Sequence, residues 1–135
     1  MSSAAIRGDA LTKRFNSFLA VNDISIAVNE GEFFGFLGPN GAGKTTTIRL
    51  LTGILPPDSG SVEIAGINLS SHPLMAKMLM GVIPEHSTIY GDLTPVQNLN
   101  LVGKFYRMGA RERDERIQEL IPRLGLSEKI GRAHV

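Results

Sequence analysis

One stretch constrains this 135-residue chain more than any other, because residues 38–45 fit the pattern G-x-x-x-x-G-K-[ST]. The apolar run Phe33–Leu37 directly before it predicts a buried strand, and a helical pattern begins at Thr45. Glycines let a backbone curl until several N–H groups point inward, and the positive end of the following helix adds to that field. The combination predicts a nucleoside triphosphate site, since a glycine-rich turn with an incidental lysine would not need the flanking strand and helix.

The residues expected to hold the nucleotide phosphates are Gly38, Pro39, Asn40, Gly41, Ala42, Gly43, Lys44, Thr45 and Thr46. Within this loop the Lys44 ammonium is expected to reach the β- and γ-phosphates. The Thr45 hydroxyl is a hard oxygen ligand of the kind that Mg²⁺ prefers. The predicted cofactors are therefore ATP, or another nucleoside triphosphate, and Mg²⁺.

The composition of the chain limits the kinds of partner, metal site and cellular location that we expect. The formal net charge is +1, so nothing global points to a nucleic-acid partner. The absence of cysteine excludes disulfides and zinc–cysteine sites. No apolar run approaches the roughly 18 residues of a membrane span, and no signal-peptide pattern opens the chain. We expect a cytoplasmic protein that reaches a membrane only through a partner.

The fold class predicted from the element order is α/β. We expect a frayed N-terminus over 1–8, strands over 9–14, 20–28, 61–65 and 81–85, and helices over 45–51, 74–80, 94–108 and 111–124. The turn at 15–18 carries Phe15, which on pattern alone is either a core anchor or a stacking surface for adenine.

Several side chains are given packing or surface roles by their spacing. Ile48, Leu51 and, less clearly, Leu50 are expected to face the sheet from the first helix. Met75, Met78 and Met80 are expected to fill gaps in the core. Glu112 and Arg116 form a predicted i, i+4 ion pair, and His72, His86 and His134 lack metal-ligand spacing.

These motifs together resemble the N-terminal part of an ABC transporter ATP-binding subunit, over residues 9 to about 126. Residues 11–15 with 20–25 resemble the opening hairpin of that family, and residues 35–46 resemble its Walker A loop almost letter for letter. Residues 55–60 resemble the following Pro-x-x-Gly loop. Residues 81–85 and 90–99 resemble the Q-loop and the start of the helical subdomain.

The resemblance implies an organisation and two further site residues. It implies a P-loop NTPase core with an antiparallel β subdomain and the Walker A loop over 1–93, and the start of an α-helical subdomain over 94–129. It implies that Phe15 stacks on adenine. At the Q-loop position, where the family usually has a Mg²⁺-binding Gln, this chain has Glu85. A carboxylate is still an oxygen ligand, so Glu85 joins Thr45 as a predicted metal ligand.

Other family motifs do not occur in these 135 residues. The signature sequence, the Walker B strand, the catalytic Glu and the switch His would all follow the helical subdomain. Residues 130–135 resemble a translated DNA-sequencing adapter, so we predict a non-native tail on a chain truncated before the signature. We expect this polypeptide to bind ATP without turnover, because no residue is available to orient the attacking water.

The implied function is that of an exporter-type ATPase subunit coupling ATP binding and hydrolysis to transport. The implied partners are transmembrane subunits and a second nucleotide-binding domain arranged head to tail, at the cytoplasmic face of the membrane, without nucleic acid. Two alternatives stay open at this stage: a soluble ABC-family ATPase acting on nucleic acid or the ribosome, and a different P-loop kinase or NTPase.

Overall fold

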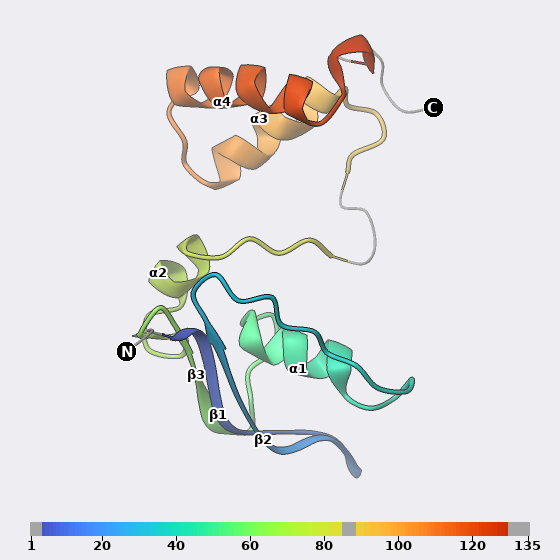
Figure 1. Ribbon diagram of the computed structural model, residues 1–135, viewed down its shortest axis with the longest axis vertical. Coiled ribbons are helices and arrows are strands. Elements are labelled where there is room, and N and C mark those ends of the chain that lie inside the picture. The colour runs from blue at the N-terminus through green and yellow to red at the C-terminus, as the bar shows by residue number, and fades with distance from the viewer. Residues whose placement is uncertain (1–3, 85–88, 130–135) are drawn as a thin grey trace. The chain divides into compact units, whose positions relative to one another are not determined.

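The computed structural model describes residues 4–84 and 89–129, and the chain divides into two compact units, residues 1–82 and 83–135. The first unit contains a β-sheet with helices α1 (Lys44–Leu51) and α2 (Pro73–Met78), and the second contains helices α3 (Pro95–Phe105) and α4 (Ala110–Arg123) (Figure 1). Among the described residues, no helix combines the length and the apolar character needed to cross a membrane.

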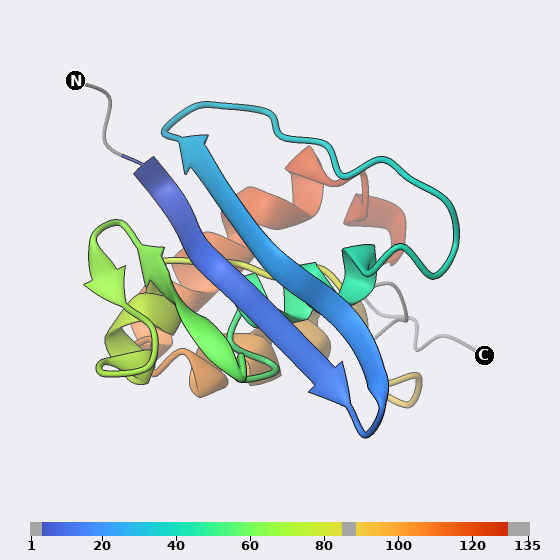
Figure 2. The same ribbon diagram turned by 90° about the horizontal axis from the view of Figure 1, so that it is seen from below.

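The sheet is antiparallel throughout and has the order β2-β1-β3-β4. Its strands are β1 (Ala4–Phe15), β2 (Phe18–Asn29), β3 (Ser59–Ile64) and β4 (Ile67–Asn68). The long β1–β2 hairpin, with β3 beside β1, is seen in Figure 2. The prediction that residues 1–8 are frayed was wrong from Ala4 onward, because Ile6 pairs with both Val28 and Ile64. A segment that pairs on both sides is held as strand whatever its own composition.

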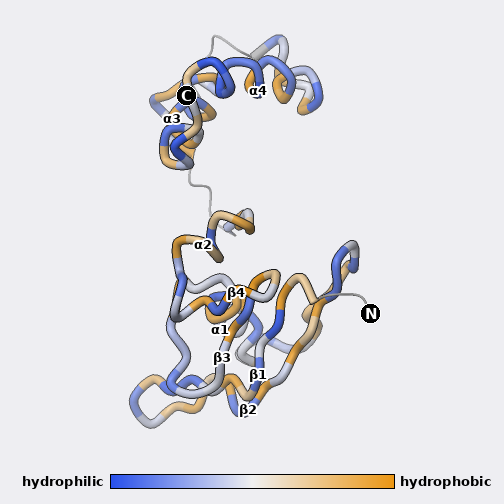
Figure 3. Tube along the Cα trace, turned by 90° about the vertical axis from the view of Figure 1, so that its left-hand side faces the viewer, coloured by the Kyte–Doolittle hydropathy of each residue, from blue (hydrophilic) through white to orange (hydrophobic). Residues whose placement is uncertain are grey.

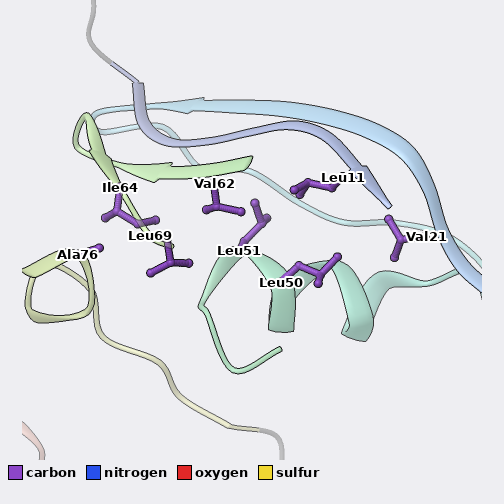
Figure 4. Packing of buried hydrophobic residues seen from close by; sticks show 8 residues of the cluster. All are labelled: Leu11, Val21, Leu50, Leu51, Val62, Ile64, Leu69 and Ala76. Atoms are coloured by element: carbon purple, nitrogen blue, oxygen red, sulfur yellow. The ribbon is translucent and has the colours of Figure 1, made fainter. Parts of the chain in front are cut away.

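Helix α1 (Lys44–Leu51) packs its apolar stripe on this sheet. The core residues are Leu11, Val21, Leu50, Leu51, Val62, Ile64, Leu69 and Ala76, which converge from the strands and from both helices of the unit (Figure 4). Leu50 is fully buried, whereas Ile48 is 45% exposed, so the prediction that Ile48 faces the sheet was wrong. The buried stripe is Thr47, Leu50 and Leu51, the i, i+3, i+4 spacing of one helix face.

The strand predicted over 33–37 is not formed in the described part of the chain. Phe33 and Leu37 are almost completely exposed. A strand needs the N–H and C=O groups of a neighbour, and the described sheet provides no partner for this segment. The strand predicted over 81–85 fails in the same way over 81–84, and Glu85 lies outside the described residues.

Helix α2 (Pro73–Met78) begins at a proline one residue before the predicted start and ends two residues before the predicted end, so it is only six residues long. A helix this short buries little, and Ala76 is its only buried residue. Met75 and Met78 are exposed, so their predicted role as core filling was wrong. Met80 is partly buried against the core.

The second unit is a helical hairpin of α3 (Pro95–Phe105) and α4 (Ala110–Arg123), followed by the 3-10 turn Ser127–Lys129. Thr94 and Gln97 form a reciprocal capping box at the start of α3. Arg113 of α4 donates hydrogen bonds to the Asn100 side chain and to the Met108 carbonyl, which ties the two helices together.

The surface of α4 carries its charges in a different pairing from the predicted one. Arg111 pairs with Glu115 at 2.8 Å, and Glu119 accepts from both Arg116 and Arg123. The predicted pair of Glu112 with Arg116 was therefore wrong, because the guanidinium of Arg116 donates instead to the carboxylate of Glu119, three residues later in the helix. Hydrophilic and hydrophobic residues alternate along α4 in Figure 3, as its amphipathic sequence requires.

Candidate functional site

The glycine-rich loop reaches the sheet at one close backbone approach. Gly43 immediately precedes α1 at φ 83°, and a Cβ there would lie 2.4 Å from the carbonyl oxygen of Ala20 on β2. The register between β1 and β2 shifts at this level, since Lys13 pairs with Val21 and Arg14 pairs with Leu19. Ala20 is thus the extra residue of a β-bulge. Gly43 is required here because only a residue without Cβ fits against that carbonyl.

Lys44 closes the loop that it terminates. Its ammonium donates to the carbonyl oxygens of Gly38 and Pro39, each at 2.6 Å. The loop is further closed by a hydrogen bond from the Ala42 N–H to the Pro39 carbonyl at 3.3 Å. The structure therefore brings the Lys44 ammonium against the first part of the loop, where two backbone carbonyls hold it.

The start of α1 is open to a ligand. No side chain caps it, and its first turn has no acidic residue. Thr45 is exposed, whereas Thr46 is half-buried. The next residue, Thr47, is buried and donates its hydroxyl to the Gly43 carbonyl at 2.9 Å, which fixes the first turn from below. Free N–H groups at a positive helix end beside an ammonium make a site for an anion with several oxygens.

Phe15 lies at the tip of the β1–β2 hairpin, directly opposite Phe18. Its ring belongs to a residue that is 46% exposed, which does not fit a core anchor. Because Ala20 is two residues beyond Phe18 and touches the loop at Gly43, the hairpin tip lies at the level of the phosphate loop. An exposed aromatic side chain at that place suits a flat apolar ligand surface.

An ion pair that the sequence did not predict holds the end of β1. The Lys13 ammonium donates to Asp58 at 2.7 Å and to the Pro56 carbonyl at 2.8 Å, and the Arg14 N–H donates to the other Asp58 oxygen at 2.7 Å. The hydrogen bond from Lys13, followed by that from the Arg14 N–H, holds the pKa of Asp58 below its usual value. Sequence reasoning placed Asp58 in a loop but had no signal for its partner 45 residues away.

The metal predictions have less structural basis. Glu85 and two of the histidines, His86 and His134, lie outside the described residues. Among the residues that the structure describes, no three His, Cys, Asp or Glu side chains gather as a metal cluster. A nucleotide-bound Mg²⁺ does not need one, because it takes most of its ligands from phosphate and water. Of the two predicted Mg²⁺ ligands, Thr45 and Glu85, the structure describes only Thr45, and its hydroxyl can serve as one oxygen ligand of a nucleotide-bound Mg²⁺.

Comparison with known proteins decides the family. The profile of the ABC transporter family matches residues 21–134, which is most of the chain. The chain belongs to the ABC transporter family. Within it, the chain is 35% identical over 124 residues to the linearmycin resistance ATP-binding protein LnrL of Bacillus subtilis strain 168, covering 92% of this chain and 40% of that one. It is 38% identical over 112 residues to the Nod factor export ATP-binding protein I of Paraburkholderia xenovorans, covering 83% and 37%.

A solved ABC protein has the same fold. The structure of the ATP-binding subunit of an ABC transporter matches 96% of this chain with a TM-score of 0.82 and 26% sequence identity. The match covers 53% of that subunit, and the chain spans about two fifths or less of the length of the curated relatives. The predicted family and the P-loop NTPase fold are thereby confirmed, and the chain corresponds to part of an ABC ATP-binding domain.

Proposed function

We propose that this chain supplies the ATP-holding part of an ATPase subunit of an exporter-type ABC transporter. The observation that carries the proposal is the arrangement of Lys44, which is folded over the glycine-rich loop at the uncapped start of α1. Membership of the ABC transporter family supports ATP as the nucleotide. The same membership favours this function over a small-molecule kinase or an unrelated P-loop NTPase.

Each predicted site residue has a task in this proposal. The N–H groups of the loop and of the first turn of α1 hold phosphate oxygens, and the Lys44 ammonium bridges the β- and γ-phosphates. The Thr45 hydroxyl binds Mg²⁺, with Glu85 as a second candidate ligand. When bound, the metal ion neutralises charge on the β- and γ-phosphate oxygens. Phe15 orients the nucleotide by stacking on adenine.

The names of two relatives support the proposed direction of transport and, with it, the proposed partners. LnrL is a linearmycin resistance protein by name, and the Paraburkholderia relative is a Nod factor export protein. Both names support export for the present chain. Its partners are then transmembrane subunits and a second nucleotide-binding domain, at the cytoplasmic face of the membrane. A role on nucleic acid or the ribosome is less well supported, since the net charge is only +1.

The proposal is tested by measuring ATP dissociation constants by calorimetry for the wild-type chain, Lys44→Ala and Arg49→Ala. Arg49 is the matched control, a cation on the exposed side of the same helix. We expect Lys44→Ala to weaken ATP binding about 10-fold or more, because hydrogen bonds to charged groups contribute about 1.5–3 kcal/mol. Arg49→Ala should change it less than about twofold. ATP binding that is absent, or unaffected by Lys44→Ala, would refute the proposal.

Hydrolysis gives a second measurement. We expect the 135-residue polypeptide to bind ATP without releasing phosphate, because the group that orients the attacking water does not occur in it. If the wild-type chain releases phosphate and Lys44→Ala does not, the expectation of no turnover is wrong, but the proposed ATP site is still supported.

A further inference from the structure

Four polar interactions join the loop residues Pro56 and Asp58 to three consecutive residues at the end of β1, and three of the four involve Asp58. Besides accepting from the Lys13 ammonium and the Arg14 N–H, Asp58 donates its own N–H to the Thr12 carbonyl at 2.9 Å. The fourth interaction joins Lys13 to the carbonyl of Pro56 at 2.8 Å. We call this set, made by Lys13, Pro56 and Asp58 with the adjoining backbone, the strand-end clamp.

The strand-end clamp begins where the β-ladder stops. The last pair between β1 and β3 is Thr12 with Ser59, so residues 13–15 continue without a β3 partner. In the described part of the chain, Asp58 and the Pro56 carbonyl replace that missing partner on this side of β1. A strand end supported on one side only would be free to twist, and the clamp removes that freedom.

The Lys13 side chain is unusually well buried for a lysine. It is only 11% exposed, whereas most lysine side chains keep the ammonium in water. Ordering and desolvating such a side chain opposes folding, and exposed ion pairs seldom repay that cost. Because ordering Lys13 is costly and the ion pair alone repays little of that cost, we look for a role of this contact beyond stability.

Phe15 is the next residue along β1 after those that the clamp holds. It follows Arg14, whose N–H bonds to Asp58, and shares one face of β1 with Lys13, two positions earlier. On the other side it pairs with Phe18, close to the approach of Ala20 to Gly43. The clamp thus joins the β1 side of the hairpin tip to residues 56–58, and the bulge at Ala20 meets the phosphate loop on the β2 side.

We propose that Lys13 and Asp58 are positioning residues for nucleotide binding, holding the Phe15 ring at the height and tilt at which it receives the base of a nucleotide whose phosphates lie in the loop. The inference rests on the proposed function for its ligand. It adds that base recognition depends on a loop after α1 that touches neither base nor phosphate.

The first test measures the ring without any nucleotide. The chain contains no tryptophan, so Phe15→Trp introduces a single fluorescent reporter at the hairpin tip. Adding Asp58→Asn should lower the fluorescence anisotropy of that tryptophan and raise its quenching by acrylamide about twofold. Asp9→Asn is the matched control, because Asp9 forms an exposed ion pair with Arg7 and is still paired with Ser61 of β3, away from the hairpin tip. It should change neither quantity.

The second test separates base from phosphate. Dissociation constants for ATP and for inorganic tripolyphosphate are measured with the wild-type chain, Asp58→Asn, Lys13→Met, Asp9→Asn and Phe15→Ala. Stacking on an aromatic side chain contributes about 5- to 150-fold in affinity, which sets the ceiling. Asp58→Asn and Lys13→Met should weaken ATP binding about 3- to 10-fold and tripolyphosphate binding less than twofold. Phe15→Ala should show the same selective loss, at least as large.

The outcomes distinguish this inference from its premise. Failure of the wild-type chain to bind ATP or tripolyphosphate would overturn the proposed function and this inference with it. Normal binding with equal losses for ATP and tripolyphosphate in Asp58→Asn would overturn the inference alone, as would an unchanged tryptophan anisotropy. The charge-swapped pair Lys13→Asp with Asp58→Lys should recover part of the ATP preference, and circular dichroism confirms that each compared variant is folded.

Discussion

The two units of the chain are stabilised in different ways. In the first, eight hydrophobic residues form one buried cluster, seven of them from β1, β2, β3 and two helices and the eighth, Leu69, from the segment after β4. In the second, the buried hydrophobic side chains of the described residues are Ile117 and Ile121, both on α4. Local contacts dominate there: a capping box, the Arg113 hydrogen bonds and three ion pairs along α4. Burial of residues distant in sequence makes the first unit cooperative, whereas the second depends on many small local terms.

The largest effect is expected in the core of the first unit. Leu50→Ala removes a fully buried side chain and should lower the free energy of unfolding by about 3 kcal/mol, because it leaves a cavity against the sheet. Ile48→Ala, on the same helix but 45% exposed, should cost less than about 1 kcal/mol. Urea denaturation followed by circular dichroism measures both, and equal losses would contradict the packing described for α1.

A smaller loss is expected at a backbone contact of the same unit. A Cβ on Gly60, at φ 93°, would lie 2.4 Å from the Asp9 carbonyl oxygen. Gly60→Ala should therefore cost about 2 kcal/mol in the same urea assay, since backbone strain of this kind costs about 1–3 kcal/mol. Gly66→Ala is the control, because Gly66 has a similar φ of 77° with open space around it. If Gly66→Ala proves as costly, the positive φ alone and not the contact determines the loss.

In the second unit the capping box should have the largest single effect, although a modest one. Thr94→Ala removes the acceptor for the Gln97 N–H and should cost about 1 kcal/mol. Thr94→Ser keeps a hydroxyl at that position and should therefore retain most of the stability that Thr94→Ala loses. Helix content near 222 nm during thermal melting reports the change, and a loss as large as that of Leu50→Ala would break the contrast between the two units.

The smallest effect is expected for the surface charges of α4. Hydrogen bonds from Arg116 and then Arg123 hold the pKa of Glu119 below its usual value of 4.5. Its stabilising contribution is present above that value and is lost as the pH falls through the lower pKa of the folded state. Wild type and Glu119→Gln should differ slightly at pH 7 and converge in acid. A difference that grows below pH 4 would show that this sign is wrong.

Sequence patterns predicted the local features of the fold and missed those that depend on distant partners. The helix start at Thr94-Pro95 and the alternation of Val62 and Ile64 follow from neighbouring residues, and both are confirmed. The apolar run 33–37 looks like a strand by composition, but strand formation requires a partner that composition does not reveal. Ile48 and Leu50 are equally apolar, and only the position of the sheet decides which one is buried.

In the candidate site, too, the sequence predicted the residues of one contiguous motif and missed the contacts between distant segments. The loop residues and Lys44 were predicted because a phosphate cradle requires a contiguous motif. The strand-end clamp was not, because Lys13 and Asp58 are common residue types whose pairing depends on the register between β1 and β3. The approach of Gly43 to Ala20 was hidden for the same reason, although the glycine itself stood out.

The bonds from Lys44 to the carbonyls of Gly38 and Pro39 make ligand entry an exchange reaction. An incoming anion that takes over the two N–H groups bonded to these carbonyls replaces existing bonds, so the net gain is the difference between two sets of bonds. A chain of several phosphates wins that competition more easily than a single phosphate group, which brings less charge and fewer oxygens. If the proposed site is correct, we expect the loop to bind a polyphosphate in preference to inorganic phosphate even without a contact to the base.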